Sequence, residues 1–224
     1  MYNCAFCGGA SGLNKDVYPR VRDRESVISE IEEILAIYPD ITSIRVLDDL
    51  FLRTPHSIDD ANQIFATFPQ LTWRGMVHAL TLVHAIDKIE GLKKNGCKEL
   101  FMGIESGSKK INKMGSVCDI IKVAKALLEN GIDLKGYFIY GFPGETKQDF
   151  EETYQLAYGL KEISTHTPGV FRTVYSVHAN PSARTKMFGF YNPISYSAET
   201  SPAPNHPLLY HTRSRSECSS RGQS

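Results

Sequence analysis

Short apolar runs and amphipathic segments alternate along most of this chain. The short runs are rich in β-branched and apolar residues and are bounded by polar or turn-forming residues, which predicts buried strands. The expected strands cover residues 41–47, 71–78, 99–104, 134–140 and 171–177. In the segments between them, apolar residues recur at helical spacing, which predicts helices with one buried face. The expected helices cover residues 26–38, 57–68, 82–94, 119–129 and 146–161.

Local signals mark several of the helix ends. Asp23 or Ser26 can cap the first expected helix. The Asn95-Gly96 pair is typical of the end of a helix. Thr146 and Asp149 have the spacing of a capping box, which predicts that the last helix begins there.

Strand and helix alternate about five times, at a spacing of roughly 30 residues, which is the size of a βαβ unit. Such alternation predicts an α/β protein with a parallel sheet, either open or closed into a barrel. In both architectures, ligands bind at the carboxyl ends of the strands. The polar, acidic or glycine residues expected at this edge are Asp48, Asp49, Glu105, Ser106, Gly141 and Glu145.

The character of the sequence changes near residue 190. Residues 190–224 contain four prolines, many serines and scattered arginines, with neither helical nor strand periodicity. This composition predicts a disordered tail. We therefore expect one folded domain over residues 1–189 and a tail over 190–224, in which Cys218 has no assigned role.

Charge and cysteine content narrow the class of protein. The 224 residues include 25 basic and 25 acidic residues, and this balance argues against a dedicated nucleic-acid or membrane-surface binder. The sequence has no apolar run of membrane-spanning length and no signal-peptide pattern. Its five cysteines are too few and odd in number for a disulfide-built secreted scaffold. We expect a cytoplasmic protein without nucleic-acid or membrane partners.

Two cysteines near the start have the spacing of metal ligands. Cys4 and Cys7 stand three apart, with Phe6 before the second and a glycine pair after it. A C-x-x-C pair suits zinc, an iron–sulfur cluster or a redox dithiol, and it also occurs as two ordinary thiols. Cys97 and Cys118 lie next to expected helices, and we interpret both as packing or incidental thiols.

The strand-end residues have structural as well as functional interpretations. Asp48 and Asp49 can cap the following turn or bind a cationic amine of a ligand. Glu105 is followed by Ser-Gly-Ser, where glycine permits close approach of the backbone. The segment Gly141-Phe-Pro-Gly-Glu145 reads first as a tight turn. These alternatives stay open on the residues alone.

Four motifs taken together resemble those of radical S-adenosylmethionine enzymes, in the branch of cobalamin-dependent methyltransferases and methylthiotransferases. The resemblance covers about residues 1–180, and the four motifs follow one another in the order typical of that family. They are Tyr-Asn-Cys4-Ala-Phe-Cys7-Gly-Gly, Leu47-Asp48-Asp49-Leu-Phe51, Phe101-Met-Gly-Ile-Glu105-Ser-Gly107-Ser and Gly136-Tyr-Phe-Ile-Tyr-Gly141-Phe-Pro-Gly-Glu145-Thr.

The resemblance implies a partial (β/α)6 barrel of the TIM type and two cofactors. A [4Fe–4S] cluster would cleave S-adenosylmethionine to a 5′-deoxyadenosyl radical that abstracts hydrogen from a small biosynthetic substrate. Cobalamin is a further cofactor in the cobalamin-dependent branch. By the same resemblance, Cys4 and Cys7 are cluster ligands and catalytic residues. The cofactor-binding residues that it implies are Phe6, Asp48, Asp49, Glu105, Ser106, Ile139 and Gly141.

The sequence departs from the family pattern at its start. The family signature is C-x3-C-x2-C, and its first cysteine would fall one position before Met1. We therefore expect an N-terminal truncation that removes one ligand and the first barrel strand. The resemblance implies an electron donor such as flavodoxin or ferredoxin as partner. The alternatives are a zinc-stabilised or metal-free α/β binding module and an inactive truncated fragment.

Overall fold

The computed structural model describes residues 21–48, 50–110 and 115–177. Within them, five parallel strands form one sheet in the order β1-β2-β3-β4-β5. The strands are β1 (Ser43–Arg45), β2 (Thr72–Val77), β3 (Cys97–Glu105), β4 (Asp133–Tyr140) and β5 (Phe171–Val177). This sequential order is the one expected of a partial barrel and confirms the predicted α/β class with a parallel sheet.

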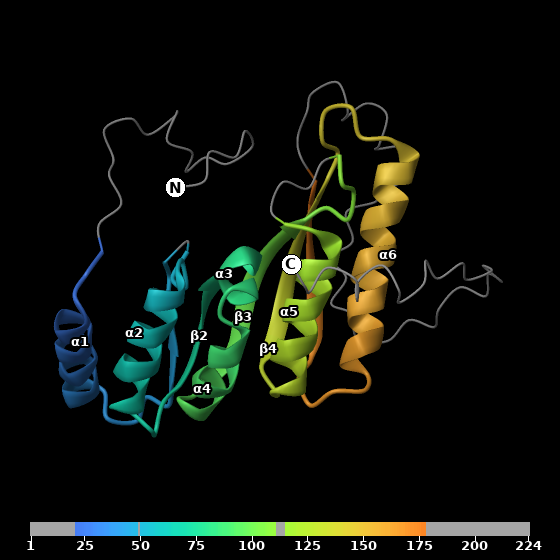
Figure 1. The fold of residues 1–224 in the computed structure, drawn as a ribbon. Coiled ribbons are helices and arrows are strands. Elements are labelled where there is room, and N and C mark those ends of the chain that lie inside the picture. The colour runs from blue at the N-terminus through green and yellow to red at the C-terminus, as the bar shows by residue number, and fades with distance from the viewer. Residues whose placement is uncertain (1–20, 49, 111–114, 178–224) are drawn as a thin grey trace.

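The helices line one face of this sheet. They are α1 (Arg24–Ile37), α2 (Pro55–Ala66), α3 (Ala79–Val83), the 3₁₀ turn η1 (Ile86–Lys88), α4 (Ile89–Lys94), α5 (Val117–Glu129) and α6 (Lys147–Ser164). Figure 1 shows α1, α2, α4, α5 and α6 side by side in front of the strands. This is the arrangement that right-handed crossovers between neighbouring parallel strands produce. In the described part of the chain, no helix is both long and apolar enough to cross a membrane.

Several helix starts follow the predicted capping chemistry. Asp23 caps α1, and its carboxylate accepts a hydrogen bond from the Ser26 N–H. Thr146 and Asp149 form the expected capping box at the start of α6. The helix predicted over 57–68 instead begins at Pro55, because Thr54 is its cap. Ser57 is the third residue of α2 rather than its first, and it forms a capping box with Thr54.

The single helix predicted over 82–94 is wrong. The chain forms α3, η1 and α4 there, and it leaves helical geometry at Ala85, where φ is −148° and ψ is 33°. The apolar pattern does not reveal this break, because the buried residues Leu82, Ala85 and Ile89 keep a helical spacing across it. The first strand is also shorter than predicted, three residues instead of seven.

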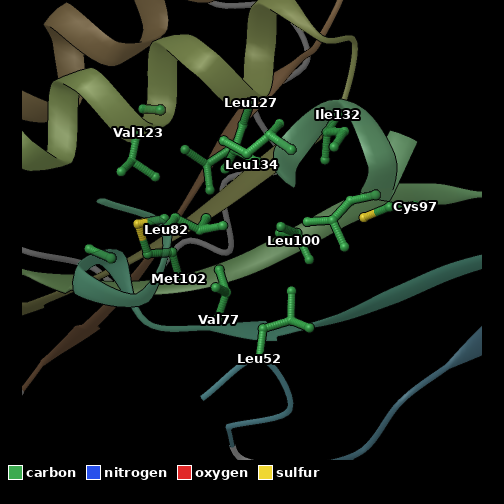
Figure 2. Close-up of a cluster of buried hydrophobic side chains, with 14 of the residues drawn as sticks. Leu52, Val77, Leu82, Cys97, Leu100, Met102, Val123, Leu127, Ile132 and Leu134 are labelled. Atoms are coloured by element: carbon green, nitrogen blue, oxygen red, sulfur yellow. The ribbon is translucent and has the colours of Figure 1, made fainter. Parts of the chain in front are cut away.

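The hydrophobic core lies between the sheet and the helices. Figure 2 shows Val77, Leu100 and Leu134 from three neighbouring strands together with Val123 and Leu127 of α5. All five side chains are buried, and full burial of a leucine or valine is worth about 1.5–3 kcal/mol.

At the amino end of the sheet, an aromatic stack and a thiol fill the core. Trp73 stacks on Phe65 at 4.6 Å, and its indole N–H donates to the Asn95 carbonyl at 2.9 Å. Cys97 is buried at the start of β3, and burial raises the pKa of its thiol. An uncharged buried thiol confirms the packing interpretation of Cys97.

The opposite face of the sheet carries most of the charged side chains of the strands, and we call it the inner face. Side chains alternate along a strand, so the residues between the core positions of β3 point to this face. Glu99, Phe101, Gly103 and Glu105 therefore lie on it, opposite to Leu100 and the other core residues of β3. The inner-face residues of the other strands used below are Ser43, Arg45, Arg74, Asp133, Lys135, Ile139 and Arg172.

Candidate functional site

Glu105 ends β3 at the carboxyl edge of the sheet, on the inner face. Its φ of 63° is the only positive value among the described non-glycine residues and turns the chain sharply out of the strand. The carboxyl group folds back over Gly103, where an added Cβ would lie 2.4 Å from Glu105 Oε1. A glycine at position 103 therefore makes room for this carboxyl group.

The environment of Glu105 disfavours its charged form. Burial raises the pKa of the Glu105 carboxyl to about 7. Among the described residues, no cation or hydrogen-bond donor engages the carboxyl group. Near neutral pH this group can therefore both donate and accept hydrogen bonds, as a ligand with hydroxyl groups requires.

The segment that follows Glu105 is anchored to α6 by a buried network. The Ser106 hydroxyl lies 2.9 Å from Thr153 Oγ1, which also accepts the Gly107 N–H at 3.0 Å. The Thr153 hydroxyl itself donates to the Asp149 carbonyl at 2.9 Å. Ser106 and Thr153 are fully buried, so these bonds form away from water and fix the path of the loop.

Gly107 allows the backbone of this loop to touch the helix. A Cβ at position 107 would lie 2.3 Å from the Glu152 carbonyl oxygen and 2.7 Å from its carbon. Both atoms belong to the backbone of α6 and have no rotamer by which to move away. Only glycine fits this contact without displacing the loop that starts at Glu105.

Asp149 joins the loop to the start of α6. Its carboxylate accepts the Ser108 hydroxyl at 2.6 Å and the Thr146 N–H and hydroxyl at 2.8 and 2.7 Å. These hydrogen bonds, that of Ser108 first, lower the pKa of Asp149 to about 2. Lys110 Nζ lies 3.8 Å from the same carboxylate and donates to the Gly144 carbonyl at 2.9 Å. The loops after β3 and β4 are therefore held together.

The loop after β4 is closed by its own glutamate. Gly141 and Gly144 have φ values of 84° and 78°, which residues with a Cβ rarely adopt. The Gly141 N–H donates to Glu145 Oε2, and the Glu145 N–H donates to the Phe142 carbonyl at 2.9 Å. Burial raises the pKa of Glu145, and its Oε1 is buried without a hydrogen-bond partner in the described structure. The predicted tight turn is confirmed, and its shape depends on Glu145.

The structure places the predicted site residues in three groups. Glu105, Ile139 and Gly141 lie at the carboxyl ends of the neighbouring strands β3 and β4. Ser106 is next to Glu105 but is buried, and its hydroxyl is bonded to Thr153. Asp48 follows β1 and accepts the Leu50 N–H at 2.7 Å, as a turn cap does.

Four predicted site residues lie outside the described residues. They are Cys4, Phe6, Cys7 and Asp49. Among the residues that are described, no three His, Cys, Asp or Glu side chains are grouped so that they could hold a metal ion. A cluster bound by Cys4 and Cys7 therefore stays a prediction.

Sequence reasoning missed the residues of α6 and of the loop after β3 that support the site. Thr153 and Lys110 carry no motif, and the capping box at Thr146 and Asp149 gave no sign of its bonds to the loop after β3. These contacts join positions 34 to 47 residues apart, which no local pattern reports. Glu145 stood at a strand end in the sequence, but its bond to Gly141 is a feature of the folded turn.

Comparison with solved structures supports the fold. The radical S-adenosylmethionine methyltransferase TsrM from Kitasatospora setae aligns with a TM-score of 0.56 and 18% identity, over 70% of this chain and 29% of that chain. The cobalamin-dependent S-adenosylmethionine radical enzyme OxsB aligns with a TM-score of 0.54 and 16% identity, over 69% of this chain and 24% of that chain. At this identity, the likeness establishes the fold alone.

Curated relatives are similar over part of their length. An uncharacterised methyltransferase of Pyrococcus horikoshii is 30% identical over 194 residues, which is 80% of this chain and 40% of that protein. A tRNA-2-methylthio-N(6)-dimethylallyladenosine synthase of Clostridium botulinum is 32% identical over 111 residues, 46% of this chain and 22% of the synthase. The chain thus spans well under half the length of these relatives.

The family profile covers the candidate site. The profile of the Radical SAM superfamily matches residues 1–157, a span that includes Cys4, Cys7, Glu105 and Gly141. This match covers more than half of the chain and confirms the resemblance found in the motifs. The chain belongs to the Radical SAM superfamily of enzymes.

Proposed function

We propose that this protein binds S-adenosylmethionine across the carboxyl ends of β3 and β4 and cleaves it reductively. The observation that supports this most strongly is that Glu105 and the Gly141 turn lie at the carboxyl ends of two neighbouring parallel strands. Parallel α/β folds bind ligands at this edge. The half-buried carboxyl group of Glu105 and the glycine backbone suit a ligand with hydroxyl groups and a flat ring.

Each residue has a distinct part in this proposal. Glu105, whose raised pKa keeps a proton available near pH 7, would bind ribose hydroxyls. Ile139 and Gly141 would contact the adenine, and Phe6 would support it. Ser106 would act through the loop that it anchors to Thr153, since its hydroxyl is bonded there. Asp48 or Asp49 would bind the methionine ammonium group.

Cys4 and Cys7 would hold the [4Fe–4S] cluster. Iron–sulfur clusters are ligated by cysteine thiolates, and a C-x-x-C pair can supply two of them. When bound, the cluster would supply the electron that splits S-adenosylmethionine into methionine and a 5′-deoxyadenosyl radical. The protein contributes the binding and orientation of the cofactor and the exclusion of competing reactions.

The reaction that we propose is methyl transfer or rearrangement of a small biosynthetic substrate. Support for methyl transfer comes from the methyltransferase of Pyrococcus horikoshii, which is similar over 80% of this chain. Cobalamin is proposed as a further cofactor, since TsrM was solved with cobalamin bound and OxsB is described as cobalamin-dependent. A flavodoxin or ferredoxin would donate the electron.

Anaerobic reconstitution with iron and sulfide tests the cluster. We expect the full-length protein to take up iron and sulfide and to gain the broad visible absorption of a [4Fe–4S] cluster. Cys4→Ser and Cys7→Ser should lose this absorption, because metal affinity comes from the assembled ligand set. Cys97→Ser is the matched control and should retain it, since Cys97 is buried in the core. Zinc retention without iron uptake would instead support the zinc-stabilised binding module.

A further inference from the structure

The amino end of the inner face carries a balanced set of charges. Arg172 Nη1 lies 3.1 Å from Glu99 Oε1 and 3.2 Å from Asp133 Oδ2. Arg74 Nε lies 3.4 Å from Glu99 Oε2, and its Nη1 donates to the Ser43 hydroxyl at 3.1 Å. Two guanidinium groups thus neutralise two carboxylates across the sheet.

Two further cations of the inner face, in register with these arginines, meet at Phe101 and are not balanced by a carboxylate of the described residues. Arg45 of β1 and Lys135 of β4 both lie against the ring of Phe101, with Arg45 Cζ at 4.9 Å and Lys135 Nζ at 5.7 Å from its centroid. Phe101 is only 3% exposed, so the two side chains and their surroundings cover the ring. Neither cation forms an ion pair with any carboxylate of the described residues.

Two like charges contact the same aromatic ring. Each cation gains about 0.5–2 kcal/mol from the face of an aromatic ring, and this contact fixes its position. The two positive charges repel each other, however, and that cost falls when an anion binds beside them. The two cations are therefore already positioned to bind an anionic group.

Phe101 lies on the same strand as Glu105 of the candidate cofactor site. Phe101 and Glu105 are on the same face of β3, four residues apart. At about 3.3 Å per residue, their Cα atoms are separated by about 13 Å. A small molecule held at Phe101 by one end would reach toward the edge where Glu105 and Gly141 lie.

We propose that Arg45 and Lys135, positioned by Phe101, bind an anionic group of the substrate, a phosphate or a carboxylate. Arginine and lysine are the side chains that form charge-assisted hydrogen bonds to such groups. The site extends across the inner face from Arg45 of β1 to Lys135 of β4, around Phe101 of β3. Two cations suit one compact anion rather than an extended nucleic-acid backbone. That this anion belongs to the substrate rests on the proposed function, whereas the anion binding itself does not.

Equilibrium binding of inorganic phosphate and of succinate to the full-length protein tests the site. At constant ionic strength, we expect saturable binding of one equivalent of at least one of the two anions. Arg45→Gln and Lys135→Gln should each weaken it about tenfold, the usual effect of losing one charge-assisted hydrogen bond. Lys122→Gln is the matched control, since Lys122 is exposed on α5, and it should bind as the wild type does.

The two anions distinguish the chemistry of the group. Preference for phosphate indicates a phosphorylated substrate, and preference for succinate indicates a carboxylate. Binding that is unchanged in both Arg45→Gln and Lys135→Gln, or no binding of either anion to the wild type, would overturn the proposal. Tight binding of a single-stranded RNA oligonucleotide that depends on both residues, without phosphate binding, would overturn it as well.

Two measurements on the wild-type protein distinguish a failure of this proposal from a failure of the proposed function. Anion binding is measured without iron, sulfide or reductant, so it needs no cluster. Anion binding without reductive cleavage of S-adenosylmethionine would leave the anion site in place and contradict the proposed function. Cleavage without anion binding would contradict the anion site alone.

Discussion

The two faces of the sheet differ in almost every physical respect. The helix-covered face is apolar and buried, and its side chains belong to one hydrophobic cluster. The inner face carries arginine, lysine and glutamate side chains, among them the Glu105 carboxyl with a raised pKa. Charged groups on a sheet face reduce the apolar burial available for stability, so this face should contribute less to stability than the helix-covered face. The contrast predicts that substitutions on the two faces have different, and in one case opposite, effects on stability.

The largest loss of stability is expected on the helix-covered face. Leu100→Ala removes a fully buried side chain of β3 and leaves a cavity among the core residues of Figure 2. We expect the free energy of unfolding to fall by about 4 kcal/mol. Chemical denaturation measures this, with exposed Lys98→Ala on the same strand as control. A loss below about 1 kcal/mol would show that this face is not the stabilising one.

The second-largest loss of stability is expected at the contact between α6 and the loop after β3. Gly107→Ala places a methyl group 2.3 Å from the Glu152 carbonyl oxygen, and we expect a loss of about 3 kcal/mol in the free energy of unfolding. Because the loop would move, binding of S-adenosylmethionine should weaken too. Gly159→Ala, within α6 and with no atom within 4 Å of the added Cβ, is the control. It should stabilise the helix by about 0.5–1 kcal/mol.

Glu105 should respond to substitution in the opposite direction. Its pKa is about 7 in the folded protein against an ordinary 4.5. Between these values the unfolded state binds fewer protons, so stability falls as pH rises from about 4.5 to 7. Glu105→Gln removes the ionisable group and should be more stable than the wild type by about 2 kcal/mol at pH 8, with little difference at pH 4.

Denaturation curves across this pH range, together with binding of S-adenosylmethionine, test the role of Glu105. Higher stability at pH 8 with weaker cofactor binding is the expected pair of results, because a site is often stabilised when its function is lost. Equal stability of the two proteins at pH 8 would show that burial does not disfavour the charge of this carboxyl group.

The smallest effect is expected from the ion pairs of the inner face. Arg172→Gln leaves Glu99 and Asp133 without the cation that they share, and we expect a loss of about 1 kcal/mol. The loss should shrink at high salt, which screens repulsion between the two carboxylates. Denaturation at low and high salt measures it, with Lys122→Gln as control. A loss as large as that of Leu100→Ala would erase the contrast between the two faces.

The sequence predicted the fold better than the site. Strand runs such as 134–140, and capping pairs such as Thr146 and Asp149, are local signals, and the structure confirms them. The break at Ala85 was missed because the buried residues kept a helical period across it. The bond between Ser106 and Thr153 joins positions 47 residues apart, which no single-chain pattern encodes. Likewise, the contact of Arg45 with Phe101 joins two strands that are not neighbours in the sheet, which no local pattern reports.

The most direct test of the account is the product formed from S-adenosylmethionine. The reconstituted full-length protein is incubated anaerobically with S-adenosylmethionine and dithionite, and 5′-deoxyadenosine and S-adenosylhomocysteine are quantified. The account predicts 5′-deoxyadenosine that is lost in Cys4→Ser and Cys7→Ser and retained in Cys97→Ser. Absence of 5′-deoxyadenosine from the wild type, or equal amounts in Cys4→Ser, would contradict it.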